Sequence, residues 1–467
     1  MTPVASFRGR RVALFGLGGS GLSTLRALAA GGAEVAAWDD EEKSRARARD
    51  AGFTPVDLAT ADWSAFAALI LAPGVPLTHP KPHWTVERAK AVGAPILGDI
   101  ELFARERAAR APDAPFIVIT GTNGKSTTTA LIAHILREAG RDVAMGGNIG
   151  VPILDLPPPD PSRVHVVECS SFQIDLAPSL APSVGALINI TPDHLDRHGT
   201  LENYAAIKER LVAGSTIALV GIDDEPSRAI AERLKRRAGA RVVAISAAPS
   251  PLADVFVEDR FIVARGEGRQ VDLRPAQALR GAHNGQNAAF AFAAARALDI
   301  DAATIGRAMA SFPGLAHRME QVGRLGRVLF VNDSKATNAD AAEKALLSFH
   351  DIFWIVGGKA KAGGIEPLRP LFGRIAKAYL IGASSDEFAH TLEGAVPFER
   401  SGTLSEAVTA ATRDATASDA AEPVALLSPA CASFDQFANF EARGDAFRAL
   451  VAAQLAGHAP QARGDAR

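Results

Sequence analysis

A loop with the residues to bind phosphate joins a β-branched run to a helical one. In "FIVITGTNGKSTTTALIAHIL", Phe116 to Leu136, the apolar run breaks into glycines, a lysine and a serine. Glycines let the backbone wrap around an anion, the lysine can reach terminal phosphates, and the serine hydroxyl suits Mg²⁺. The spacing departs from the standard pattern, because Ile119 stands where its first glycine would be. An ordinary strand–helix turn is the alternative, but the strand, turn and helix together favour a nucleotide loop made of Gly121, Thr122, Asn123, Gly124, Lys125, Ser126 and Thr127.

Acidic and histidine side chains follow two later strands. "HVVECSS" ends its apolar run on Glu168, and "NITPDHLDRH" places Asp193, His194 and Asp196 just past another strand. The carboxyl ends of parallel strands meet at one edge of a sheet, where ligands bind. Taken alone, Glu168 could be a helix cap or a surface acid, and His194 a loop histidine. The neighbouring phosphate loop favours a metal site.

A second glycine turn stands near the N-terminus. "GLGGSG" fits G-x-G-x-x-G at Gly16, Gly18 and Gly21, and Asp39 ends the next strand. By itself this pattern is typical of a dehydrogenase that binds NAD through its pyrophosphate and ribose. A dehydrogenase would have no use for a second nucleotide site with metal-binding acids.

Polar side chains also mark two later regions. "HNGQN" supplies Asn284 and Asn287, whose amides suit adenine or its ribose, although Asn284 could instead cap a helix; Arg318 is shaped to hold phosphate oxygens. A third group of side chains suits a dicarboxylate amino acid, which needs cations and hydroxyls: Asp333, Lys335, Thr337 and Asn338 of "NDSKATN", Lys361 of "GGKAKAGG", and Ser433 of "SPACASFDQF". Cys431 lacks a histidine nearby in sequence, so a buried structural cysteine is expected.

The elements that position these residues form three α/β regions in series. Strand and helical patterns alternate from "RVALF" onward, which predicts parallel sheets. We predict an N-terminal Rossmann-like domain at 1–108, a central ATPase-type parallel sheet at 109–312, and a Rossmann-like C-terminal domain at 313–467. Charge-rich "ELFARERAARAPDAP" is expected to be an exposed helix, "HNGQNAAFAFAAARALDI" a helix with one apolar face, and the tail "GHAPQARGDAR" disordered.

Composition narrows the class of protein. The 467 residues are 48% hydrophobic and 22% charged, as in a soluble enzyme, and the net charge of −2 gives no basic surface for nucleic acid or membrane. Two cysteines fit a reducing compartment. No apolar run reaches the roughly 18 residues of a membrane span. We therefore expect a cytoplasmic monomer whose partners are small molecules.

The loop "GTNGKST" resembles that of the Mur ligases and their folylpolyglutamate synthetase relatives. Blocks similar to Mur ligases run from "GLGGSGLS" to "LSPACASFDQFANFEARG", nearly the whole chain. The resemblance implies an ATP-dependent ligase that adds D-glutamate to UDP-N-acetylmuramoyl-L-alanine through an acyl phosphate. It implies two Mg²⁺ ions held by Ser126, Glu168, His194 and Lys208, the last carbamylated by CO₂.

The same resemblance assigns further residues. Charge neutralisation and catalysis are expected from Lys125, Glu168, His194, Lys208, Arg318 and Asp333. The UDP substrate is expected near Gly19, Ser20, Asp39, Gly74, Asn148, Ser171 and Gln173. The resemblance places D-glutamate near Thr337, Lys361, Ser433 and Phe440, and the residues of "NDSKATN" add Lys335 to this group. The base that deprotonates the amine stays open between Asp333 and His194.

Three alternatives remain at this point. A dehydrogenase would explain the N-terminal turn alone. A folylpolyglutamate synthetase shares the phosphate loop, but has no reason for the N-terminal βαβ unit. A non-enzymatic nucleotide switch would not need Lys361, Ser433 and the acids.

Overall fold

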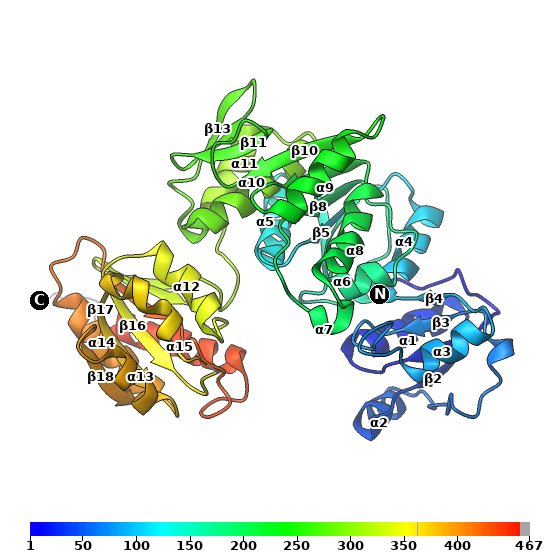
Figure 1. The fold of residues 1–467 in the computed structure, drawn as a ribbon, viewed down its shortest axis with the longest axis horizontal. Helices are drawn as coiled ribbons and strands as arrows, with labels where there is room; N and C mark the ends of the chain where they lie inside the picture. Colours follow the sequence, from blue (N-terminus) through cyan, green and yellow to red (C-terminus); the bar gives the residue numbers. More distant parts are fainter. Residues whose placement is uncertain (362, 458–467) are drawn as a thin grey trace, which may run out of the picture. The chain divides into compact units, whose positions relative to one another are not determined.

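The chain forms three α/β sheets in series, as predicted (Figure 1). The structure is a computed structural model that describes residues 1–361 and 363–457. Beyond Gly457, the tail expected to be disordered lies outside those residues. The first two sheets share one compact unit, Met1–Arg274 with Asn284–Ala310, and the third belongs to a second unit, Pro275–His283 with Ser311–Arg467. The boundaries at 108/109 and 312/313 stay predictions.

The first sheet is parallel, with strand order β2-β1-β3-β4. Its strands are β1 (Arg11–Phe15), β2 (Glu34–Trp38), β3 (Leu69–Leu71) and β4 (Ile96–Leu97), and its helices are α1 (Gly19–Gly31), α2 (Glu42–Asp50), α3 (Trp84–Ala91) and α4 (Asp99–Arg110). The order reverses between β1 and β3, so the glycine turn after β1 lies at a switch point of the sheet. A Cβ on Gly21 would lie 1.8 Å from the Gly16 carbonyl oxygen, so this turn requires glycine.

The central sheet has the order β13-β12-β11-β10-β9-β8-β5-β7-β6 and is parallel from β6 to β11. Its strands are β5 (Phe116–Thr120), β6 (Asp142–Gly147), β7 (Arg163–Glu168), β8 (Val184–Leu187), β9 (Ile217–Gly221), β10 (Arg241–Ser246), β11 (Val255–Glu258), β12 (Phe261–Ala264) and β13 (Gly268–Asp272). Since β5 lies between β7 and β8, the ends of these strands meet beside the phosphate loop.

Two helical expectations in this unit are wrong. The helices after β5 are α5 (Lys125–Glu138), α6 (Ser171–Asp175), α7 (Leu195–His198), α8 (Leu201–Ala213), α9 (Glu225–Lys235), α10 (Ala282–Arg296) and α11 (Ala302–Ser311). α10 is buried on every side from Asn284 to Ala295, because alanines and phenylalanines alternate around it rather than along one face. α4 is not an exposed helix: its charged sequence hides three buried acids, Asp99, Glu101 and Glu106.

The third sheet has the order β14-β15-β19-β16-β17-β18 and is parallel except at β14. Its elements are β14 (Glu320–Leu325), β15 (Val328–Asn332), β16 (Ile352–Gly357), β17 (Ile375–Ile381), β18 (Phe398–Gly402), β19 (Val424–Leu427), α12 (Ala339–Ser348), α13 (Ser385–Leu392), α14 (Leu404–Thr416) and α15 (Phe440–Gly457). α12 and α13 pack into the core on one face, and α14 and α15 into the core on the other. None of the helices in the described residues is long and apolar enough to cross a membrane.

Candidate active site

The phosphate loop lies between β5 and α5, and two glycines shape it. Gly121 has a φ of 152° and Gly124 a φ of 83°, conformations that residues with a Cβ rarely adopt. A Cβ on Gly124 would also lie 2.4 Å from Asn287 Oδ1. Lys125 Nζ donates to the carbonyl oxygens of Gly121 at 3.0 Å and Thr122 at 2.8 Å. The Lys125 amine therefore folds back onto the carbonyl oxygens of its own loop.

Asparagines distant in sequence fix this loop. Asn189 Oδ1, just past β8, accepts hydrogen bonds from two loop amides at 3.1 and 2.9 Å. Asn287 is buried, accepts from Thr128 Oγ1 at 3.2 Å and donates to Asn284 Oδ1 at 3.2 Å. Asn287 thus contacts the first turn of α5, and Asn284 lies inside α10 and contacts Asn287. Their expected role toward adenine stays a prediction. Asn189 was missed in the sequence, because only the fold brings it beside the loop.

Lys208 of α8 is buried beside the same loop. Its side chain is only 1% exposed, and Nζ donates to Gly121 O at 2.9 Å and Thr120 Oγ1 at 3.1 Å. Nζ also lies 4.7 Å from the centre of the Tyr204 ring. Burial, together with the charge of Lys125, lowers the pKa of Lys208 to about 7. A sizeable fraction of this amine is therefore neutral near pH 7. Its burial also shows that Lys208 is not one of the solvent-exposed lysines that are common on helices.

Glu168 ends β7 with one carboxylate oxygen bonded and one open. Oε1 accepts from Asn148 Nδ2 at 2.8 Å. Oε2 is buried and has no hydrogen-bond partner among the described residues. A buried anionic oxygen without a donor is costly unless a cation binds it. The donor set therefore fits a hard divalent cation at this strand end.

His194 lies in the loop after β8, on the approach to α7. Its backbone is left-handed, with a φ of 53°, and Nε2 lies 3.4 Å from Asp193 Oδ2. The ring centre is 5.0 Å from that of Phe172, and half of the side chain is exposed. Within residues 1–361 and 363–457, no group of three or more His, Cys, Asp or Glu is placed to hold a metal. The expected set does not require one, since Ser126 and Lys208 are its other members.

The N-terminal turn is held by an acid. Asp39 accepts the Leu17 amide at 2.6 Å through Oδ2 and the Glu41 amide at 2.9 Å through Oδ1. A Cβ built on Gly19 or Gly74 would meet open space, and the Gly74 carbonyl accepts from Arg197 Nη1 at 3.0 Å. The Asp39 carboxylate orders the turn, and its contact with substrate stays a prediction, as do those of Gly19, Ser20 and Gly74.

Two expected substrate residues after β7 are enclosed. Ser171 Oγ lies 2.9 Å from His198 Nε2, and both side chains are buried. Gln173 is buried, and its Oε1 accepts the Ser170 amide at 3.1 Å while its Nε2 faces the carboxylate of Asp99. Both ends of the Gln173 amide are therefore engaged within the protein.

In the second unit, Asp333 follows β15 and is buried. Its Oδ2 accepts from Ser428 Oγ at 2.8 Å, and its Oδ1 accepts the Met319 amide at 3.2 Å. Burial raises the pKa of Asp333 to about 7, although both donors and the charge of Arg318 act to lower it. Such a carboxyl group can take up or release a proton near neutral pH.

The residues expected at the amino acid follow neighbouring strands. Lys335 and Thr337 follow β15, Ser433 follows β19 and Lys361 follows β16, and these strands are adjacent in the sheet. Lys335 Nζ lies 5.1 Å from the ring centre of Phe440. Ser433 is buried and Lys361 is exposed.

A buried arginine that was missed in the sequence joins these loops. Arg443 of α15 donates through Nε to Ser334 Oγ at 3.0 Å, and through Nη2 to Ser334 O at 2.8 Å and Cys431 O at 3.0 Å. Cys431 is a buried free thiol, as predicted. "FEARGD" gives no local sign that its arginine points inward, because a charged residue on a helix is usually solvated.

Comparison with known proteins identifies the family. A model of the Mur ligase middle domain matches residues 119–295. The chain is 62% identical over 460 residues to UDP-N-acetylmuramoylalanine–D-glutamate ligase of Nitrobacter hamburgensis, covering 97% of this chain and 98% of the relative. It is 60% identical over 456 residues to the protein of the same name from Rhizobium etli, covering 97% of each. The chain belongs to the Mur ligase family.

Solved Mur ligases share the fold. The chain aligns with UDP-N-acetylmuramate-alanine ligase MurC of Thermotoga maritima at a TM-score of 0.56 and 17% identity, covering 95% of this chain and 99% of that one. MurF of Acinetobacter baumannii gives a TM-score of 0.55 at 19% identity, covering 77% and 80%. These likenesses concern the fold.

As a Mur ligase, the chain is an ATP-dependent enzyme that joins an acid to an amino acid. This membership removes the dehydrogenase and the non-enzymatic switch from the alternatives. The "GLGGSG" turn is thus a glycine turn of a Mur ligase, which explains why a second nucleotide loop follows it.

Proposed function

We propose that this Mur ligase joins the amino group of D-glutamate to the carboxylate of UDP-N-acetylmuramoyl-L-alanine, with ATP converted to ADP and phosphate, in the synthesis of peptidoglycan precursors. Relatives that carry this activity in their names match the chain along nearly its full length. The observation that carries the proposal is the buried Lys208 amine, which shares the Gly121 carbonyl with the phosphate-loop Lys125. Cytoplasmic location and a monomeric state stay predictions.

Activation of the acid is the first chemical task. A carboxylate does not condense with an amine in neutral water, because hydroxide is a poor leaving group. The substrate carboxylate attacks the γ-phosphorus of ATP, the bond to the bridging oxygen breaks, and ADP leaves. The D-glutamate amine then attacks the acyl carbon, and phosphate leaves from the tetrahedral intermediate. Lys125 and Arg318 neutralise negative charge in these steps.

The second task is to bring anions together. Ser126, Glu168, His194 and Lys208 would hold Mg²⁺, which neutralises phosphate charge when bound. A protonated Lys208 would repel the metal. A neutral Lys208 amine can add to CO₂, forming a C–N bond and releasing a proton, and the resulting carbamate offers oxygen ligands. The pKa of about 7 supports this reaction, since it supplies the neutral amine.

The amine of D-glutamate must lose a proton during its attack. Asp333 suits this task by its pKa of about 7, whereas His194 suits it by its exposure.

Phosphate release tests the proposal. Purified protein with ATP, Mg²⁺ and UDP-N-acetylmuramoyl-L-alanine is given D-glutamate, L-glutamate or no amino acid. We expect sustained release only with D-glutamate. Absence of release from the complete mixture, or equal release by Lys125→Ala, would overturn the proposal.

A further inference from the structure

Asp99 is a fully buried acid without a role in the chemistry described so far. It is the first residue of α4, in the segment that links the first sheet to the central one, and it is 5% exposed. Its Oδ1 accepts the Ile100 amide at 2.9 Å. Burial raises the pKa of Asp99 more than its hydrogen bonds lower it. A carboxyl group kept in such a place at an energetic cost calls for an explanation.

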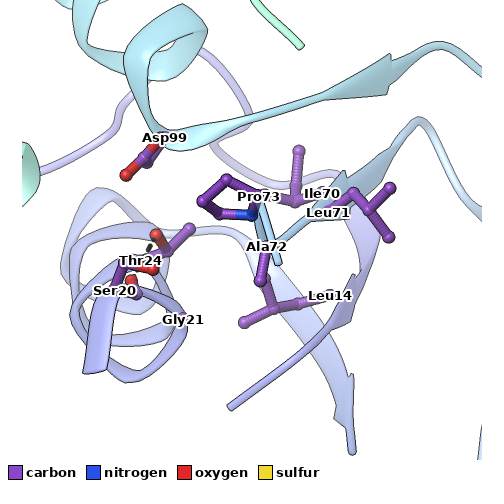
Figure 2. A pocket seen from close by; sticks show the side chains of 9 residues that line it. All are labelled: Leu14, Ser20, Gly21, Thr24, Ile70, Leu71, Ala72, Pro73 and Asp99. Carbon is purple, nitrogen blue, oxygen red and sulfur yellow. Dashed lines mark hydrogen bonds between the residues drawn. The ribbon is translucent and has the colours of Figure 1, made fainter. Parts of the chain in front are cut away.

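The surroundings of Asp99 belong to the substrate turn. It lines a pocket together with Ser20, Gly21 and Thr24 of α1 and Pro73, which follows β3 (Figure 2). Figure 2 shows the carboxylate on the side of the pocket that faces the start of α1. The acid therefore faces the first turns of α1, which follow the glycine turn expected to hold the UDP substrate.

On its other side, Asp99 reaches toward the metal-binding strand end. Gln173 Nε2 lies 3.4 Å from Asp99 Oδ1 and 3.3 Å from Oδ2. The other end of that amide, Oε1, accepts from the Ser170 amide at 3.1 Å and from Ser170 Oγ at 3.2 Å. Ser170 follows Glu168 by two residues. A continuous chain of hydrogen bonds thus runs from the acid to the segment that leaves β7.

The direction of each hydrogen bond depends on Asp99 being an acceptor. Because the carboxylate takes the NH₂ end of Gln173, the carbonyl end must face Ser170, where it closes a capping box at the start of α6. Without an acceptor at position 99, the Gln173 amide could turn over and present NH₂ to the Ser170 amide. The Ser170 amide and hydroxyl, two residues after Glu168, would then lose the acceptor that they share.

We propose that Asp99 is a positioning residue, which orients Gln173 and thereby the strand end that carries Glu168, so that the metal-binding acid and the substrate turn stay in register. The inference rests on the proposed function, because it gives Glu168 the role of a metal ligand. Groups that orient a metal ligand from behind typically change metal affinity or activity by about 10- to 100-fold when altered.

An exchange of polarity tests this chain. Asp99→Asn places NH₂ opposite the NH₂ of Gln173, and Gln173→Glu places two carboxylates together in a buried site. The double variant D99N/Q173E reverses donor and acceptor between the two side chains and keeps the net charge. We expect Asp99→Asn to need about tenfold more Mg²⁺ for half-maximal phosphate release. The Mg²⁺ concentration that the double variant needs for half-maximal phosphate release should return to within about threefold of the wild-type value.

Glu101→Gln is the matched control. Glu101 is a fully buried acid of the same helix, and it accepts from the Ser179 amide at 2.9 Å and from Ser179 Oγ at 2.7 Å, but its contacts do not lead to Glu168. It should lower the thermal midpoint while leaving the Mg²⁺ requirement unchanged.

The possible outcomes separate the role from mere packing. An unchanged Mg²⁺ requirement in Asp99→Asn, or an equal shift in Glu101→Gln, would overturn the inference. If Asp99→Asn does not fold, the double variant tests the inference instead. A folded double variant that needs about tenfold more Mg²⁺ than the wild type would also overturn it. Failure of the proposed function would look different, since the wild type would then show no Mg²⁺-dependent phosphate release.

Discussion

Glu168 and Asp333 are buried carboxylates at the ends of strands in different sheets, yet their oxygens are treated differently. Both oxygens of Asp333 accept hydrogen bonds within the second unit, from Ser428 and Met319. Glu168 has a donor on one oxygen only, and its Oε2 is buried without a partner among the described residues. The fold thus completes one carboxylate and leaves the other to be completed by a ligand. The second arrangement is typical of a cation site.

The neighbouring charges extend the contrast. Lys208 and Lys125 both donate to the Gly121 carbonyl, so the charged Lys125 and the partly neutral Lys208 amine lie together at the phosphate loop in the first unit. Burial raises the pKa of Asp333 to about 7, although the positive charge of Arg318 acts to lower that pKa. The first region is therefore suited to anions and metal, and the second to proton transfer near neutral pH.

The largest effect is expected from Glu168→Gln. It removes the anionic oxygen but keeps the shape of the side chain, and it should reduce kcat by roughly 100- to 1000-fold, as loss of one electrostatic stabiliser does. The thermal midpoint should not fall, because the lost oxygen has no protein partner. Glu106→Gln is the control, since that buried acid is paired with Arg110. Equal losses in the two variants would break the contrast between open and completed carboxylates.

Lys208→Ala should have the next largest effect on kcat. We expect a loss of at least about 100-fold, because the variant lacks the group that would become the carbamate. Formate or acetate can enter the space left by the side chain and offer carboxylate oxygens. Steady-state rates with and without about 100 mM carboxylate check this. That concentration fills most of a site whose Kd is roughly 10 mM. Full activity without added acid would remove the carbamate from the proposal.

Asp333 should make stability fall as pH rises. Its folded pKa of about 7 lies above the usual 3.8, so between these values the unfolded chain ionises while the folded protein does not. The stability that the protonated Asp333 retains relative to its ionised form is fully present below pH 3.8 and is lost by about pH 7. At about 1.4 kcal/mol per pKa unit, the loss is at most on the order of 4 kcal/mol.

Denaturant unfolding of the wild type and Asp333→Asn between pH 4 and pH 8 measures this contribution. The difference in free energy of unfolding should shift in favour of the variant as pH rises. Lys208→Met gives the opposite test, since a folded pKa of about 7 against 10.5 makes the wild type gain stability from pH 7 to 10.5. Parallel curves for wild type and Asp333→Asn would show that burial does not perturb the acid.

The sequence was sufficient for the architecture and for residues inside local motifs. Strand ends such as Glu168, the loop from Gly121 to Thr127 and the three sheets follow from patterns a few residues long. The sequence did not predict which charged residues are buried. Asp99, Arg443 and Lys208 are buried, although the charged sequences of their helices are typical of solvent-exposed helices. Their partners are distant in the chain, and a single sequence does not show which helix faces turn inward. Lys208 was singled out only through the family resemblance, and its role at the metal stays a prediction.

The smallest effect, from Ser428→Ala, would make Asp333 resemble Glu168. The variant removes the hydroxyl that donates to Asp333 Oδ2 at 2.8 Å and leaves that oxygen buried without its donor. We expect a loss of about 1–3 kcal/mol at pH 8, where the carboxylate is charged, and a smaller loss at pH 4, where it is protonated. Since this donor acts to lower the pKa of Asp333, the pH window of the stability loss should move upward.

Ser384→Ala is a suitable control, because the Ser384 hydroxyl contacts Cys431 Sγ at 3.5 Å rather than a carboxylate. The stability that this variant loses should not depend on pH between pH 4 and pH 8. If Ser428→Ala instead lost the same free energy at both pH values, the hydroxyl would serve packing alone, and the two carboxylates would differ only in burial.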